Sequence, residues 1–173
     1  MMNRMPIWAK RSLVWLVVVV GVYLLVEAVR SLLLVISVRT RWQTGLELTH
    51  WYNKKIGNPI ALRFQRKQVT VVHHNGRSSG REYVTPVWAE PVEDSFLIHL
   101  PYGTGVDWCR NVLTARGCTI EHEGVSFDTT APRIVSAADA LAIVPERMRK
   151  MDQLMAVESY LRLDVIPAPA TAS

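Results

Sequence analysis

A basic, glycine-containing turn is the segment best suited to bind an anion. Residues 75–81 read Asn-Gly-Arg-Ser-Ser-Gly-Arg and stand between two stretches rich in β-branched residues. Successive backbone N–H groups in such a turn form a concave set of donors, to which two serine hydroxyls and two guanidiniums add. The pattern predicts a phosphate or carboxylate site. A solvated hairpin turn with basic residues is the alternative interpretation.

A second glycine-containing segment supports the same prediction. Residues 102–105 read Tyr-Gly-Thr-Gly and precede Asp107, which can cap a short helix over residues 108–115 that Gly117 would close. The N-terminus of that helix would also attract an anion.

No metal site or activated nucleophile is predicted. The five histidines show neither an i,i+4 pair nor a CxxC-type partner, and His73 and His74 would face opposite sides of a strand. Cys109 and Cys118 are expected to be free thiols in a reducing compartment, and no neighbouring base is evident for either. The sequence also lacks a Walker loop, a GxGxxG fingerprint and a hydrolase elbow. The catalytic residues therefore stay unknown at this point.

Alternating apolar residues predict the strands that position these segments. Strands are expected over residues 68–74, 82–90 and 95–101, and a further hairpin over residues 118–135. Pro86 requires an edge, a bulge or a ligand-facing position, because it cannot donate to a strand ladder.

The chain becomes helical in period towards its C-terminus. Over residues 136–163, Ser136 and Asp139 are start signals and Pro145 is a break. Five or six closely spaced strands followed by helices predict an α+β fold with a small antiparallel barrel.

The apolar residues are concentrated near the N-terminus. Of the 173 residues, 49% are hydrophobic and 20% charged, which excludes a disordered chain. Residues 13–26 carry no charge, and after Glu27 and Arg30 the apolar run resumes to Val38. One helix over residues 13–38 would be about 39 Å long, enough to span a bilayer with tilt. A cleaved signal peptide or a buried core helix are the alternatives.

Charge is divided unevenly along the chain, although the net charge is only +5. Residues 39–81 carry nine Lys or Arg and one Glu, whereas residues 82–173 carry seven Lys or Arg and thirteen Asp or Glu. The first part interleaves cations with Trp42 and Trp51, as expected on an anionic lipid surface. Nucleic-acid binding is the alternative and is disfavoured directly after an anchor. A short helix around His50 should end at residues 57–59, Gly-Asn-Pro.

Three motifs in one order resemble the deazaflavin-dependent nitroreductase family of split β-barrel oxidoreductases, which use coenzyme F420. The family pattern runs strand, T-x-G-R-x-[ST]-G, a polar residue followed by Pro, an apolar strand and W-[YF]-x-N-L. The corresponding segments here are residues 75–80, Thr85 to Trp88 and Trp108 to Val112, and a looser likeness covers residues 48–165. Asn75, Tyr102 and Cys109 depart from the usual residues.

The resemblance implies a fold, a cofactor and a set of binding residues. The basic turn would contact the coenzyme's phosphate and side chain, the second strand would run under the deazaflavin ring, and the two segments after the third strand would line its other edge and close the site. The residues concerned are Arg77, Ser78, Ser79, Tyr83, Val84, Thr85, Pro86, Val87, Trp88, His99, Leu100, Pro101, Tyr102, Asp107, Trp108, Cys109, Arg110 and Asn111. Flavin mononucleotide and haem are the alternative cofactors within the same superfamily.

The chain is thus expected to consist of five segments. These are a basic N-terminus (1–11), a transmembrane anchor helix (12–38), a basic amphipathic juxtamembrane segment (39–67), a split β-barrel domain with C-terminal helices (68–166) and a disordered tail (167–173).

The leading functional hypothesis is a single-pass membrane protein whose cytoplasmic domain passes a hydride from reduced F420 to a lipophilic acceptor. The acceptor would be a quinone such as menaquinone, or a nitro compound, and Tyr160 would be an acceptor-side hydroxyl. The alternative is an accessory subunit of a membrane protein complex that has kept the barrel without a cofactor, or with haem or flavin. Membrane lipid is the expected partner and nucleic acid is not.

Overall fold

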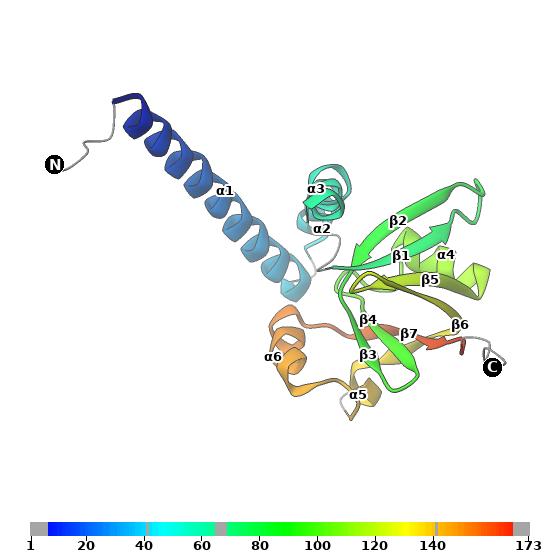
Figure 1. Cartoon of the computed structure of the whole chain (residues 1–173). Helices are drawn as coiled ribbons and strands as arrows, with labels where there is room; N and C mark the ends of the chain where they lie inside the picture. The colour runs from blue at the N-terminus through cyan, green and yellow to red at the C-terminus, as the bar shows by residue number, and fades with distance from the viewer. Residues whose placement is uncertain (1–6, 41, 65–68, 141, 168–173) are drawn as a thin grey trace.

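The computed structural model describes residues 7–40, 42–64, 69–140 and 142–167. A long N-terminal helix leads through short helical segments into one curled sheet, with further helices at its ends (Figure 1). Of the predicted disordered tail, residues 168–173 lie outside the described residues.

Helix α1 runs without interruption over Ile7–Thr40 and projects away from the rest of the molecule (Figure 1). Its side chains are exposed from Arg11 to Val26, so this segment is not a buried core helix. By length and composition, Arg11–Ser37 could cross a membrane.

The helical segment that follows α1 is longer than expected. Helix α2 (Gln43–Tyr52), the π-helical turn η1 (Asn53–Gly57) and helix α3 (Asn58–Phe64) follow one another directly. The expectation that residues 57–59 end the helix is therefore wrong. In η1 the backbone N–H of Asn58 donates to the Asn53 carbonyl, so the helix continues through a wider turn. Pro59 is the second residue of α3, and a proline is tolerated there because the N–H groups of a first helical turn have no partner within the helix.

One sheet of seven antiparallel strands forms the body of the molecule in the part of the chain that the structure describes. The strand order is β2-β1-β5-β6-β7-β4-β3, and the two edge strands are consecutive in sequence (Figure 1). The sheet thus curls into a split antiparallel barrel, and the α+β fold class is confirmed. The strands are β1 (Thr70–Asn75), β2 (Glu82–Val87), β3 (Ala89–Val92), β4 (Ser95–His99), β5 (Gly117–His122), β6 (Val125–Ser136) and β7 (Ser159–Val165).

The single strand expected over residues 82–90 is two strands, separated at Trp88. Of the three positions that the sequence allowed for Pro86, the structure shows an edge, because β2 pairs with β1 alone and Pro86 lies opposite Val71.

The C-terminal region contains a strand where the sequence predicted a helix. Helices α5 (Ala137–Ala140) and α6 (Glu146–Met155) flank the predicted break at Pro145, but residues 159–165 form β7 between β6 and β4. The left-handed Ala156, with φ of 46°, ends α6. Pairing on both sides and burial of alternate leucines outweigh local helix propensity here.

Helix α4 (Asp107–Ala115) packs against β1, β5 and β6. Both of its ends differ from the prediction. Val106 is its N-cap residue, so Asp107 is the first helical residue and makes no cap. Arg116, with φ of 61°, closes the helix in place of Gly117. Gly117 begins β5, where a Cβ atom would collide with the carbonyl oxygen of Thr129 on β6.

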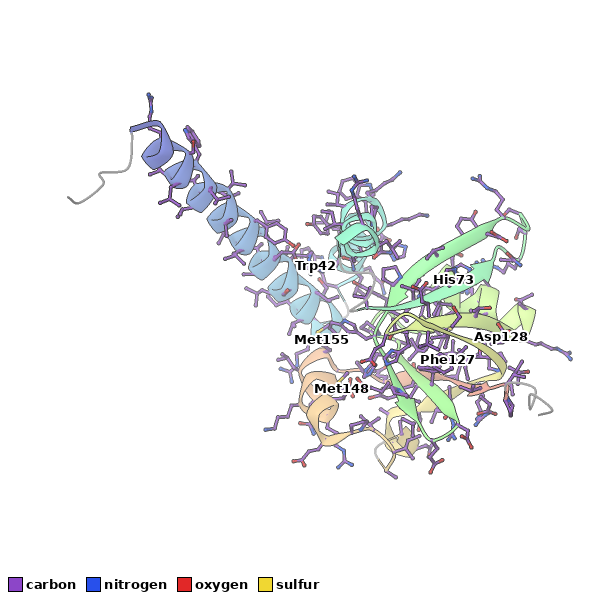
Figure 2. All side chains as sticks on the ribbon, viewed as in Figure 1. Trp42, His73, Phe127, Asp128, Met148 and Met155 are labelled. Carbon is purple, nitrogen blue, oxygen red and sulfur yellow. The ribbon has the colours of Figure 1, made fainter. Side chains whose placement is uncertain are left out.

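Two buried clusters hold the elements together. Val72, Ile98, Ile120 and Leu161 belong to the first, inside the barrel. The second joins Leu34 of α1 to residues of β4, α6 and β7, among them Leu97, Met155 and Tyr160. Figure 2 labels Met155 where α6 approaches the C-terminal end of α1. The long helix is therefore packed against the barrel at this end.

Candidate functional site

The basic turn between β1 and β2 has a defined backbone. The N–H of Gly76 donates to the carbonyl of Arg81 at 2.8 Å, and the N–H of Gly80 donates to the carbonyl of Gly76 at 2.8 Å. Gly80 has φ of 64°, a left-handed conformation that glycine adopts without steric cost. The side chains of Arg77, Ser78 and Ser79 are exposed on this turn.

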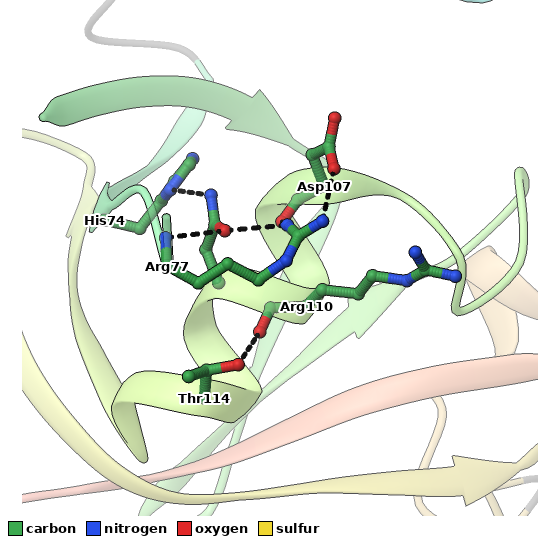
Figure 3. A network of polar contacts seen from close by, with 6 residues as sticks. His74, Arg77, Asp107, Arg110 and Thr114 are labelled. Atoms are coloured by element: carbon green, nitrogen blue, oxygen red, sulfur yellow. Dashed lines mark hydrogen bonds and ion pairs between the residues drawn. The ribbon is translucent and has the colours of Figure 1, made fainter. Parts of the chain in front are cut away.

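Helix α4 holds Arg77 through two side chains (Figure 3). Arg77 donates from Nη1 to Asn111 Oδ1 at 2.9 Å and from Nη2 to Asp107 Oδ1 at 3.0 Å. Its backbone N–H also donates to Asn111 Oδ1, at 3.2 Å. Figure 3 shows the Arg110 guanidinium directed away from this group.

Behind the turn, a buried histidine orients Asn111. Because Arg77 donates to the amide oxygen, the Asn111 amide nitrogen is the donor to His74 Nδ1, at 3.2 Å. His74 then carries its proton on Nε2, which lies 3.1 Å from the hydroxyl of Thr85. Burial lowers the pKa of His74, and the neighbouring His73 acts in the same direction. A neutral imidazole therefore supports the turn.

A cavity of about 530 Å³ opens beside this group, and we call it the turn-side cavity. Its wall combines the basic turn, β2, the start of α4 and the η1–α3 segment. Arg77 and Lys54 bring positive charge to it, against the carboxylate of Asp107. Its lining residues include Asn53, Lys54, Arg77, Ser78, Ser79, Tyr83, Thr85, Pro86, Tyr102, Asp107, Trp108 and Asn111.

A second cavity of about 310 Å³ adjoins the first, and we call it the α1-side cavity. Helix α1 forms part of its wall, together with η1, α3, the β2–β3 junction and the segment after β4. Its lining residues include Tyr23, Glu27, Arg30, Leu34, Asn53, Val87, Trp88, His99, Leu100, Pro101, Tyr102 and Trp108. Asn53, Pro86, Tyr102 and Trp108 belong to both walls and so lie between the two cavities.

Hydrogen bonds join α1 to this partition. Arg30 pairs with Glu27, three residues earlier on the same helical face, at 2.6 Å and donates to Asn53 Oδ1 at 3.2 Å. Asn53 in turn donates to the Tyr102 hydroxyl at 2.6 Å. Burial raises the pKa of Tyr102 to about 12, so the phenol stays protonated at neutral pH.

Most of the predicted cofactor-binding residues line one of the two cavities. The exceptions are Cys109, which is fully buried in the barrel core, and Arg110, which is exposed. Tyr160 lies on β7 with 3% of its surface exposed and lines neither cavity. Among the residues whose placement the structure describes, no group of three metal-ligating side chains occurs.

Several lining residues were not singled out from the sequence. Asn53 and Lys54 come from the π-helical turn, which no local pattern predicted. Tyr23, Glu27 and Arg30 come from a helix that was interpreted as an anchor alone. The pair of opposite charges within an apolar run was the available signal, because such charges in apolar helices mark functional positions.

Comparison with known proteins supplies the family. A sequence model of the F420H(2)-dependent quinone reductase family matches residues 46–159, from α2 to the start of β7. The chain belongs to this family. The resemblance to F420-dependent split-barrel enzymes is thereby confirmed, and the family's name describes an F420-dependent oxidoreductase. No curated protein matches the chain.

Solved structures with similar architecture have low sequence identity to this quinone reductase family member. An F420-H2-dependent reductase is 12% identical, with a TM-score of 0.38, over 56% of this chain and 95% of the other. A conserved hypothetical protein from Mycobacterium tuberculosis is 12% identical, with a TM-score of 0.41, over 66% of this chain and 91% of the other. HutZ, a heme storage protein from Vibrio cholerae, is 12% identical, with a TM-score of 0.42, over 65% of this chain and 90% of the other.

Proposed function

We propose that this chain is a membrane-anchored oxidoreductase that transfers a hydride from reduced F420 to a lipophilic acceptor such as menaquinone. The observation that carries the proposal is the pair of adjoining cavities. One presents fixed donors for an anion, and the other has a wall made by the apolar helix α1.

The turn-side cavity suits a coenzyme with a planar ring and an anionic side chain. Its volume of about 530 Å³ lies within the range typical of cofactor sites. Arg77, Ser78 and Ser79 would hold the phosphate, while Pro86 and Trp108 would lie along the ring. When bound, the coenzyme supplies the hydride, and the protein supplies binding, orientation and exclusion of water.

The supporting side chains preorganise the anion donors. Asn111 and Asp107 hold the guanidinium of Arg77 before any ligand arrives, so less ordering is needed on binding. Asn111 is itself oriented by the neutral His74.

The α1-side cavity is suited to an acceptor that enters from lipid. Leu34, Val87 and Leu100 give it apolar walls, and α1 would hold its mouth near the bilayer. The exposed aromatic side chains of Trp42 and Trp51, with the exposed Lys54 nearby, would rest on anionic lipid headgroups. A quinone is favoured over a nitro compound because quinones reside in the membrane that α1 would cross.

Function also requires the barrel to lie on the cytoplasmic side, where the deazaflavin is expected. A reporter fused after Ser173 should therefore report a cytoplasmic C-terminus. An external C-terminus would contradict the enzymatic proposal.

The direct test uses the full chain in lipid nanodiscs. Titration with F420 should change the coenzyme's fluorescence, and menaquinone should oxidise the reduced coenzyme only when the protein is present. Flavin mononucleotide should compete weakly. No F420 binding and no quinone-dependent oxidation would contradict the proposal, and stable co-purification of such an inactive protein with a partner would identify an accessory subunit instead.

A further inference from the structure

A buried histidine in the wall of the α1-side cavity has one ring nitrogen engaged and the other without a partner. The side chain of His99, at the end of β4, is 1% exposed, and its Nδ1 lies 2.7 Å from Oδ1 of Asp152. Its Nε2 has no hydrogen-bond partner within the described part of the chain. A buried ring nitrogen without a partner is unfavourable, so its presence beside a cavity points to a ligand that supplies the missing bond.

Two further elements hold this histidine in place. Asp152 comes from α6, and its second oxygen accepts a hydrogen bond from the Tyr160 hydroxyl of β7 at 2.8 Å. Burial and the adjacent carboxylate raise the pKa of Tyr160, so the phenol remains the donor. Asp152 therefore accepts on both oxygens, which places a proton on Nδ1 of His99 and leaves Nε2 as the nitrogen for chemistry.

We propose that His99, oriented by Asp152 and Tyr160, donates a proton to the oxygen of the acceptor in the α1-side cavity. The proposal rests on the proposed function, since it takes that acceptor to be a quinone. The hydride brings the quinone two electrons and one proton, which leaves a hydroquinone monoanion. The Nε2–H bond of the His99 imidazolium then breaks as an O–H bond forms on that oxygen. Throughout this step Nδ1 of His99 keeps its proton, which is hydrogen-bonded to Asp152. Nε2 then regains a proton from solvent.

Access to Nε2 requires one side chain to move. Less than 1 Å² of this atom is exposed. The Trp88 indole packs edge-on to the His99 ring, with centroids 6.4 Å apart, and is itself 49% exposed. Trp88 stands at the junction of the two edge strands and lines the same cavity. We therefore assign it as the cover that the acceptor displaces.

The charges around the cavity favour Asp152 as the group that stabilises an imidazolium. Glu27 and Arg30 of α1 also line this wall, but they neutralise each other at 2.6 Å. Tyr102 carries no charge at neutral pH, because burial raises its pKa to about 12. Apart from Glu27, no acidic side chain in the described part of the chain lines this cavity.

The test compares His99→Gln and Asp152→Asn with the matched control His73→Gln in full-length protein in nanodiscs. His73 also lies beside a carboxylate, 3.3 Å from Glu121, but lines neither cavity. We expect His99→Gln to lower kcat for menaquinone by about 100-fold, the usual size of a general-acid contribution, with little change in KM or in the F420 dissociation constant. We expect Asp152→Asn to lower kcat by about tenfold, because the His99 ring would lose the carboxylate that orients it. His73→Gln should change neither kcat nor KM for menaquinone.

Two readouts separate proton donation from a structural role. The wild-type kcat should fall with rising pH, and His99→Gln should lose that dependence. In the absence of coenzyme, a quinone analogue should shift the ring ¹⁵N resonance of His99 Nε2. Unchanged kcat and pH profile in His99→Gln would overturn the proposal, as would a lost kcat with no ¹⁵N shift.

Failure of the proposed function gives a different result. In that case wild-type protein itself would neither bind F420 nor reduce menaquinone, and both proposals would fall together. Active wild type with an equally active His99→Gln variant overturns the proton donor alone.

Discussion

The two buried histidines of the barrel show how neighbouring cavities acquire different chemistry. His74 hydrogen-bonds to the neutral side chains of Asn111 and Thr85 and stacks on Tyr83, and burial lowers its pKa, so it serves as a neutral support for the basic turn. His99 instead has its Nδ1 2.7 Å from the carboxylate of Asp152, and its Nε2 has no partner among the described residues. The two rings are both buried, so they differ in their hydrogen-bond partners and not in their depth of burial.

The same contrast extends to the two cavities. The turn-side cavity presents the Arg77 guanidinium already held by the side-chain oxygens of Asn111 and Asp107, as suits a bound anion. The α1-side cavity is lined by His99, whose Nε2 is buried and unpaired, and by a helix that could enter lipid by its length and composition. The following predictions test this division.

The largest effect is expected at the turn. Arg77→Ala should weaken F420 binding about 10–100-fold, because charge-assisted hydrogen bonds contribute about 1.5–3 kcal/mol. Arg81→Ala is the matched control, since it removes a guanidinium from the same turn that lines neither cavity. Fluorescence titration measures both affinities. Equal losses in the two variants would show that the turn acts through its net charge alone.

A smaller effect is expected at the α1-side wall. Arg30→Met removes the hydrogen bond to Asn53 and leaves Glu27 without its partner. The KM for menaquinone should rise about fivefold, the size expected from one hydrogen bond, while the F420 dissociation constant should stay the same. Arg39→Met, near the end of the same helix and outside both cavity walls, is the control. Weaker F420 binding in Arg30→Met would contradict the division between the cavities.

The supporting role of His74 predicts a pH dependence of stability. The folded-state pKa of His74 lies below its ordinary value of 6.5, so the unfolded chain takes up the proton first. Its contribution to stability is therefore complete above about pH 6.5 and is lost as pH falls below that value. His74→Gln should have a lower Tm than wild type at neutral pH, by a margin that narrows towards about pH 5. A constant margin over this range would show that the ring is not held neutral.

The smallest effect concerns the two thiols of the barrel. Burial raises the pKa of Cys109 to about 11 and that of Cys118 to about 11, so neither forms an appreciable thiolate near neutral pH. A thiol reagent should react slowly with folded protein and rapidly in denaturant. Fast labelling of the folded protein would contradict the packing of α4 on the sheet, in whose core Cys109 lies.

Local patterns in the sequence were sufficient to find β1 and the basic turn that follows it. Alternation of β-branched residues predicted β1, the turn chemistry predicted residues 75–80, and Pro86 predicted an edge. These features depend on residues close together in the chain, so their physical causes can be read in one dimension. The continuous apolar run predicted helix α1 for the same reason.

Only the tertiary structure decided how the walls of the α1-side cavity are built. β7 is a strand because it is paired and buried on both sides, although its own residues suit a helix. The bond between His99 and Asp152 joins residues 53 positions apart, and Asn53 meets Tyr102 across 49 positions. Such contacts depend on how the sheet curls and where α1 and α6 pack against it. The sequence by itself thus determined α1, β1 and the basic turn, because their causes are local, while packing over long separations decided the fate of residues 159–165 and which side chains share a cavity.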